Sequence, residues 1–303
     1  MAGSIANFPG GVASWGVPLM GGYSIPSTTG QYLFVDSTNG SDGNLGDTPT
    51  TAKRTIGGAQ SAAVASRGDV VVVMPGYAET RTAVLTLSKA GVYYKALGHG
   101  ALAGAITCNG TVDAMSVTGA SVTIDGFRFP GPLTDAQTAD INVAAANCTI
   151  RNTYHIGSIA TENKVDIITV ASGGDDLIVE GVNAYNTVVD CVSWLSLEAA
   201  VARPIIRGCN VMGTFSTGNL MDEATATLAL VENNTFLNTK TTGACLTFTT
   251  GNTTGMCRFN HLSGRNTTIL SNSVTGTGMD FFENRVTEQA QLNGAIIPAA
   301  DAE

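Results

Sequence analysis

From residue 92 onward the chain repeats a short motif: an apolar residue or cysteine, then a charged residue, then in most copies glycine or asparagine. The first residues of the eight copies are Tyr94, Ile124, Ile150, Val179, Ile206, Val231, Cys257 and Phe282. Successive copies are 25 to 30 residues apart. A unit of this length cannot bury its apolar face alone, so neighbouring units must stack. The short strand-like segments therefore predict an all-β fold, a right-handed parallel β-helix solenoid.

The charged residues of the motif alternate in sign without a break. They are Lys95, Asp125, Arg151, Glu180, Arg207, Glu232, Arg258 and Glu283. Stacked parallel strands place equivalent residues about 4.8 Å apart. Opposite charges attract at that spacing and like charges repel, so the alternation favours one register of the coils. We expect a continuous ladder of ion pairs along the solenoid.

The third residue of the motif suits a sharp corner, because glycine and asparagine tolerate left-handed backbone best. Six copies carry one of the two, namely Gly126, Asn152, Gly181, Gly208, Asn233 and Asn284, whereas Ala96 and Phe259 are exceptions. Second apolar segments precede the motif at Asp140–Ala144, Asp166–Ala171, Cys191–Leu197 and Cys245–Thr249. They predict at least two strands in each coil.

The segment before the repeat predicts a different local structure. We expect a strand over Tyr32–Asp36, a helix over Thr55–Ser66 with Thr55 as its N-cap, and an apolar strand over Val70–Met74. Repeat folds need terminal caps, so the helix is expected to cover the end of the core. Residues 31–91 then form the first strand, capping helix and first coil, residues 92–286 the coils, and residues 287–303 a C-terminal tail.

Residues 1–30 differ from everything after them. They contain no charged residue, but they hold seven glycines and three prolines, which oppose regular helices and strands. They also carry Phe8, Trp15, Leu19 and Tyr23 and are too apolar for a solvated linker. We interpret residues 1–30 as an arm that packs either on its own domain or on a neighbouring subunit.

Composition narrows the possible partners and compartment. Only 13% of the residues are charged, and the net charge is −9 with a pI near 4.7, which argues against nucleic acid or an anionic membrane surface as partner. The N-terminus lacks a signal-peptide pattern, and no stretch approaches about 20 apolar residues. We expect a protein made in the cytoplasm. Its six cysteines are expected to be buried free thiols: Cys108, Cys148, Cys191, Cys209, Cys245 and Cys257.

The segment YLFVDSTNGSDGNLGDTPTTAKRTIGGAQSAA, followed by GDVVVVMPGYAET, resembles the N-terminal part of the pectate-lyase-like β-helix superfamily. The matching positions are Asp36, Gly40, Asp42, Gly46, Pro49, Ala52, Thr55, Ile56, Gly68, Asp69, Pro75 and Gly76. With the coils, the resemblance covers residues 31–286 and implies the fold alone, since the scaffold hosts lyases, hydrolases, adhesins and virion proteins. The uncharged arm before this segment also resembles small β-helix structural proteins of tailed bacteriophages.

Candidate catalytic residues are few. A glycosidase needs two carboxylates about 5–9.5 Å apart. Asp175 and Asp176 are the best pair, with His155 or Asp222 and Glu223 as candidate neighbours. The hydrolase branch of the superfamily combines acidic pairs with an HG and an RIK-like motif, and this chain has neither in a matching context. We therefore interpret Asp175 and Asp176 as a solvated corner and predict no catalytic residue.

Candidate residues for metal or sugar binding are also few. The loop Asp36–Asp47 carries Asp36, Asp42, Asn44 and Asp47, oxygen ligands that suit calcium, but it lacks EF-hand spacing. His99, His155 and His261 lie in different coils and are expected at the surface or at corners, and Trp194 in the core. We predict no metal and no cofactor.

Three functions remain. The main prediction is a virion structural protein, a capsid decoration or cement protein that assembles as a homotrimer on the major capsid protein. The alternatives are a tail spike or fibre adhesin, with or without polysaccharide depolymerase activity, and a free carbohydrate-active enzyme. An arm that docks on a particle and the absence of a catalytic motif favour the first.

Overall fold

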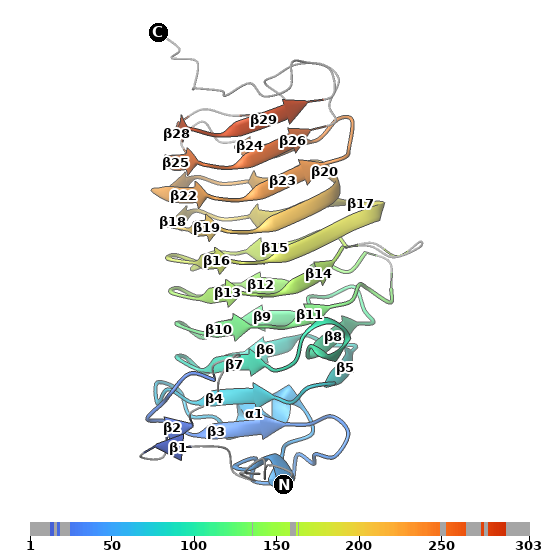
Figure 1. Ribbon diagram of the computed structural model, residues 1–303, viewed down its shortest axis with the longest axis vertical. Helices are drawn as coiled ribbons and strands as arrows, with labels where there is room; N and C mark the ends of the chain where they lie inside the picture. The colour runs from blue at the N-terminus through green and yellow to red at the C-terminus, as the bar shows by residue number, and fades with distance from the viewer. Residues whose placement is uncertain are drawn as a thin grey trace, which may run out of the picture.

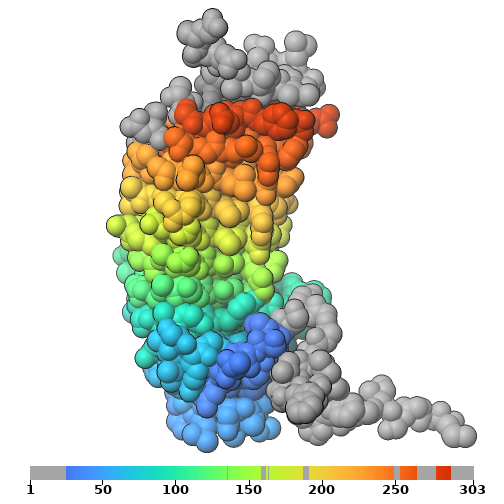
Figure 2. Space-filling view, turned by 90° about the vertical axis from the view of Figure 1, so that its left-hand side faces the viewer, coloured from blue at the N-terminus to red at the C-terminus, as the bar shows by residue number. Residues whose placement is uncertain are grey.

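The structure is a computed structural model that describes residues 13–14, 17–18, 25–134, 136–157, 162, 164–248, 253–264, 274–275 and 278–288. The chain winds into a stack of coils, with the N-terminal segment at one end and the last strands at the other (Figure 1). Coloured by residue number, the coils form successive bands along an elongated body (Figure 2). No helix in the described ranges is long and apolar enough to cross a bilayer. The predicted right-handed parallel β-helix is confirmed.

Each coil contributes strands to three faces of the solenoid. The first face is a ten-stranded parallel sheet of β3 (Tyr32–Val35), β4 (Val70–Val73), β7 (Tyr93–Ala96), β10 (Thr123–Asp125), β13 (Thr149–Arg151), β16 (Ile178–Glu180), β19 (Ile205–Arg207), β22 (Ala229–Glu232), β25 (Gly255–Arg258) and β28 (Met279–Phe282). The second face is built from β5 (Ala78–Arg81), β8 (Ala105–Cys108), β11 (Arg128–Phe129), β14 (Tyr154–Ile156), β17 (Asn183–Leu197), β20 (Asn210–Asp222), β23 (Thr235–Asn238), β26 (His261–Gly264) and β29 (Arg285–Glu288).

The third face closes the coil. It consists of β6 (Leu85–Leu87), β9 (Met115–Val117), β12 (Ile141–Val143), β15 (Asp166–Val170), the ends of β17 and β20, β24 (Ala244–Phe248) and β27 (Val274–Thr275). These strands match the second apolar segments of the sequence. The second-face strands were missed, because they follow the corner directly and several are only two or three residues long.

Short elements complete the described chain: the antiparallel pair β1 (Ala13–Ser14) and β2 (Val17–Pro18), the pair β18 (Val201–Ala202) and β21 (Ala226–Thr227), and two 3₁₀ turns, η1 (Pro49–Thr51) and η2 (Gly100–Leu102). Helix α1 (Ile56–Ala62) begins where predicted, with the Thr55 hydroxyl accepting from the Gly58 amide, but ends four residues earlier than Ser66. Its apolar residues Ile56 and Ala59 pack into the core near β3 and β4, as a cap requires.

The charged residues pair across the first face in the predicted register from Lys95 to Arg258. Ion pairs join Lys95 to Asp125, Asp125 to Arg151, Arg151 to Glu180, Glu180 to Arg207, and Glu232 to Arg258. We call this row the charge ladder. Inward of it, the aligned apolar residues from Tyr94 to Val231 and Cys257 are buried in one continuous core.

The last step of the predicted ladder is wrong. Arg258 pairs with Phe282, and Cys257 with Phe281, so the final coil is shifted by one residue. The shift puts Glu283 at the corner with a φ of +48°, where Asn284 was expected. Phe259, counted as an exception, also adopts this conformation with a φ of +55°. Asn284 instead turns inward, where its Oδ1 accepts from the Asn260 amide 3.0 Å away and fixes the shifted register.

The arm and the tail lie mostly outside the described residues. The last part of the arm packs on its own domain, because Thr28 hydrogen-bonds the Gly68 carbonyl and Tyr32 donates to the Pro26 carbonyl. The proposed docking of residues 1–30 on another subunit stays a prediction.

Candidate functional site

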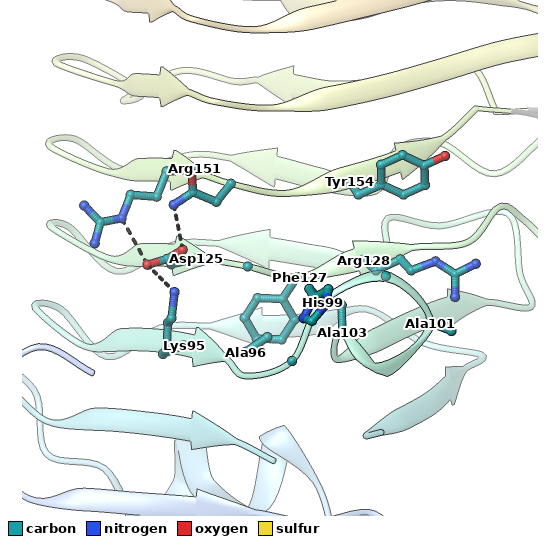
Figure 3. A pocket seen from close by; sticks show the side chains of 14 residues that line it. Lys95, Ala96, His99, Ala101, Ala103, Asp125, Phe127, Arg128, Arg151 and Tyr154 are labelled. Atoms are coloured by element: carbon teal, nitrogen blue, oxygen red, sulfur yellow. Dashed lines mark hydrogen bonds and ion pairs between the residues drawn. The ribbon is translucent and has the colours of Figure 1, made fainter. Parts of the chain in front are cut away.

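A groove of about 820 Å³ opens at the corner between the first and second faces. Its lining residues come from β7, β10, β11, β13 and β14 and from the loop that contains η2 (Figure 3). The lower coils of the charge ladder form one wall, Arg128 and Tyr154 form the other, and Phe127 lies between them. The floor follows the left-handed corner, where Gly126 has a φ of +82° and a Cβ would lie 2.7 Å from the Ala96 carbonyl oxygen.

The ladder wall is organised around Asp125, which is 2% exposed. Its Oδ2 lies 2.9 Å from Lys95 Nζ and 3.1 Å from Arg151 Nε, and its Oδ1 accepts from Asn152 Nδ2 at 3.1 Å. Tyr93 donates to Oδ2 at 2.5 Å and lies under the Arg151 guanidinium, whose carbon is 5.4 Å from the ring centroid. Donors from Lys95, Arg151, Asn152 and Tyr93 therefore converge on the Asp125 carboxylate.

The pKa values follow from this arrangement. Burial acts to raise the pKa of Asp125, but hydrogen bonds from Tyr93, Asn152 and Lys95 outweigh it and hold the pKa below its ordinary value. Burial, reinforced by Asp125, raises the pKa of Tyr93 above its ordinary range. Asp125 is thus ionised at neutral pH and unsuited to act as a general acid.

The opposite wall is open. Arg128 is half-buried and makes no ion pair with any residue in the described ranges, and Tyr154 next to it is 41% exposed. The lining residues include three cations, Lys95, Arg128 and Arg151, and one carboxylate, Asp125, so their formal net charge is +2. The whole chain carries −9. The groove is therefore a local cationic site on an acidic protein.

A second hollow of about 370 Å³ adjoins the first along the same corner and shares Asn152 with it. It is lined by Asn152, Glu180, Gly181, Arg207, Gly208 and Asn233. The two together form a track along the long axis of the solenoid, with polar side chains repeating at every coil. An extended polymer with a regular spacing of polar groups fits such a track.

Asp175 and Asp176 lie at a corner of the solenoid, as the sequence indicated. Asp175 accepts from the Ala202 amide at 2.7 Å, and Asp176, whose φ is +56°, forms two hydrogen bonds with Arg203 of the next coil at 2.6 and 2.7 Å. The bonds from Arg203 lower the pKa of Asp176. Both carboxylates are occupied by backbone or arginine, and neither lines the cationic groove.

His155 is not at the surface or at a corner, contrary to expectation. Its ring is fully buried in β14 and stacks on Phe129 with centroids 4.7 Å apart. Nδ1 lies 2.9 Å from Asp140 Oδ2, and Nε2 lies 2.9 Å from the Thr153 hydroxyl. Burial lowers the pKa of His155, so the ring is neutral at pH 7. His99 and His261 are exposed, as predicted.

The remaining candidates, Asp222 and Glu223, have different surroundings. Asp222 is buried and accepts from the Thr253 hydroxyl, whereas Glu223 lies within electrostatic reach of Asp166 and Glu198. Asp166, a residue the sequence did not single out, is 5% exposed, and burial, reinforced by these two glutamates, raises its pKa to about 6.

Carboxylates of the Asp36–Asp47 loop accept hydrogen bonds from nearby backbone amides. Asp36 accepts from the amides of Thr38 and Asn39, and Asp42 accepts from the amides of Arg54 and Thr55. The carboxylates therefore serve separate turns and do not converge, and within the described ranges no three His, Cys, Asp or Glu side chains are grouped as metal ligands. Trp194 is a core residue, as predicted, with its ring centroid 5.8 Å from that of Phe236, and all six cysteines are buried and free.

The fold relates this chain to known structures. A pectate lyase, Pel9A, matches with a TM-score of 0.54 at 15% identity, over 87% of this chain and 78% of that one. A rhamnogalacturonan lyase matches with a TM-score of 0.55 at 16% identity, over 85% of this chain and 74% of that one. No family model and no curated protein sequence matches the chain. The shared architecture confirms the β-helix fold that the resemblance of the N-terminal segment implied.

Proposed function

We propose that this protein binds an anionic polysaccharide along the cationic groove, as a β-helix adhesin of the tail spike or fibre kind. The observation that carries the proposal is a net charge of +2 in the groove of a −9 chain, with Arg128 unpaired in the described structure and Tyr154 exposed beside it. An arginine fork binds carboxylates and sulfates with two parallel hydrogen bonds, and an aromatic ring stacks on a sugar face. Two fold neighbours named as lyases of pectate and rhamnogalacturonan support a polysaccharide ligand.

The groove favours binding over hydrolysis. Asp125 is the single carboxylate among the lining residues, and its lowered pKa opposes acid catalysis. A glycosidase requires a second carboxylate across the scissile bond. The binding experiment must therefore also be able to detect depolymerase activity.

The experiment compares Arg128→Gln with Arg285→Gln on immobilised polygalacturonate and on neutral dextran. Arg128 and Arg285 lie in the same outward row of the second face, six strands apart, so the second variant is a matched loss of charge outside the groove. We expect Arg128→Gln to weaken binding to the anionic polymer roughly tenfold, the loss of one charge-assisted hydrogen bond. Arg285→Gln should bind the anionic polymer as the wild-type protein does. Neutral dextran should not be bound.

Reducing-end and ultraviolet assays on the same samples separate binding from cleavage. New reducing ends or an unsaturated product would convert the adhesin into a depolymerase. If the wild-type protein binds neither polygalacturonate nor a sulfated polymer, the proposal fails.

A capsid decoration protein is the second proposal, and one surface favours it. Ile178, Ile205, Leu230 and Met256 share the outward register of the first face in four successive coils, where they are partly exposed. An apolar row on the outside of a sheet is typical of an assembly interface, here between copies of this chain. Quantitative mass spectrometry of purified particles tests it. Hundreds of copies near a simple ratio to the shell protein would support decoration, and a few to some tens would place the protein on a tail.

A further inference from the structure

The interior of the solenoid contains a charged cluster that the groove does not use. Asp140 and Lys164 come from successive coils, and their side chains are 3% and 0% exposed. Lys164 Nζ lies 2.6 Å from Oδ1 and 2.5 Å from Oδ2 of Asp140. His155, also 0% exposed, completes the cluster from β14. The amine of Lys164 therefore lies within hydrogen-bond distance of both Asp140 oxygens, and the pair is out of contact with solvent.

The surroundings hold this pair in one geometry. Gln137 Nε2 lies 3.3 Å from Asp140 Oδ1, and residue 137 forms a parallel bridge with residue 164. The His155 ring is fixed between Phe129 and the Thr153 hydroxyl. Because the Asp140 carboxylate can only accept, the proton of neutral His155 is on Nδ1 and is directed at Oδ2, and Nε2 then accepts from the Thr153 hydroxyl.

We propose that Lys164 and Asp140 condense into an intramolecular amide cross-link. The cluster starts as an ion pair, and a proton moves from Nζ to the carboxylate to give a neutral amine and a neutral acid, the two forms from which an amide can form. Nζ then forms a bond to Cγ. The Cγ–oxygen bond of the protonated oxygen breaks, and that oxygen leaves with the second Nζ proton as water. One amide and one water replace the ammonium and carboxylate, and no oxidant is needed.

His155 is the positioning residue for this step. Attack on Cγ places negative charge on the oxygen that remains, and the Nδ1 proton 2.9 Å from Oδ2 stabilises that charge. The fixed contact of the two reacting groups supplies a high effective concentration, and exclusion of solvent removes the water that would reverse the reaction.

The cross-link would join two successive coils. Asp140 directly precedes β12, and Lys164 comes two residues before β15, the strand that pairs with β12. A covalent tie at this position would join coils that elsewhere are held by hydrogen bonds, ion pairs and the apolar core. It would survive denaturants that separate the coils.

Mass spectrometry of the unaltered protein is the first test. Condensation lowers the intact mass by one water, and the loss persists after unfolding. Trypsin cannot cleave after an acylated Lys164 and does not cleave the Arg203–Pro204 bond, so residues 129–151 should be recovered joined to residues 152–207. An intact mass equal to the sequence mass, with peptide 152–164 recovered free, would overturn the proposal.

Three variants separate a cross-link from an ion pair. Lys164→Arg keeps the charge but should restore the full mass, and Asp140→Asn should lose ammonia in place of water. His155→Asn should form the cross-link at least tenfold more slowly after synthesis, while Lys89→Arg should match the wild-type protein. Circular dichroism confirms folding of each. Loss of water in folded Lys164→Arg would contradict the assignment of the amine.

Discussion

The charge ladder and the buried Asp140 cluster contain the same chemical groups in opposite settings. On the ladder, Arg207 and Glu180 are 47% and 27% exposed and 2.7 Å apart. In the core, Lys164 and Asp140 are 0% and 3% exposed at a similar separation. Geometry alone does not distinguish the two pairs. Solvent does, because water screens the first pair and is excluded from the second.

The difference decides what each pair contributes. An exposed pair is worth at most about 1 kcal/mol, and its effect is on register. A buried pair can cost as much to desolvate as it gains, yet removing one partner leaves a buried charge with nothing to balance it. The ladder therefore selects an arrangement of coils, while the cluster makes the interior intolerant of change. Three substitutions test this contrast.

Lys164→Met should have the largest effect. It removes the amine that balances the Asp140 charge, and with it any amide formed between the two residues, and it leaves the carboxylate buried beside a neutral histidine. We expect a loss of at least about 3–5 kcal/mol in the free energy of unfolding. Urea denaturation followed by circular dichroism measures it. Lys89→Met is the control, because Lys89 makes no ion pair with the described residues. A loss below about 1 kcal/mol would mean that Asp140 is protonated or solvated, and the contrast between core and surface would fall.

Asp166→Asn should instead stabilise the protein at neutral pH. The folded-state pKa of Asp166 is raised to about 6, first by burial and then by Glu198 and Glu223. Between about pH 4 and pH 6 the unfolded chain ionises this group while the folded chain keeps it protonated, so wild-type stability falls as pH rises. Above pH 6 the penalty is complete, at most about 3 kcal/mol.

Asparagine mimics the protonated acid and still accepts from the Ser193 amide, which is 2.9 Å from Oδ1 in the wild-type protein. The variant should gain stability at pH 7 and equal the wild type at pH 4. Thermal unfolding at the two pH values measures this. An equal effect at both would show that the change acts through packing and not through charge.

The fold could be predicted because its signals repeat. Seven charged positions of alternating sign, each after a buried residue, determine the register from Lys95 to Arg258. The prediction failed at Glu283, where the final coil is one residue shorter and the charge pattern continued by coincidence. Gly126 was predicted at a corner, but the sequence gave no indication that a groove opens there or that Arg128, on a two-residue strand, would line it.

The interior cluster could not be predicted from spacing. Asp140, His155 and Lys164 belong to three segments with no shared motif. They meet because the start of the third face, which Asp140 and Lys164 precede, lies beside the second-face strand that carries His155. His155 was expected at the surface because isolated histidines in polar segments usually are exposed. Its burial depends on Asp140 and Thr153, which satisfy both ring nitrogens.

Arg207→Glu should have the smallest effect. It puts a third acidic side chain between Glu180 and Glu232, its partners on the two neighbouring strands. Because Arg207 is about half exposed, we expect a loss of only about 0.5–1 kcal/mol, which shrinks in high salt as screening increases. Arg54→Glu is the control, since it makes the same change of charge at an exposed residue that forms no ion pair with the described residues. A loss in Arg207→Glu that equals the control and does not respond to salt would remove the ladder's role in register and leave the buried core as the sole determinant of how the coils stack.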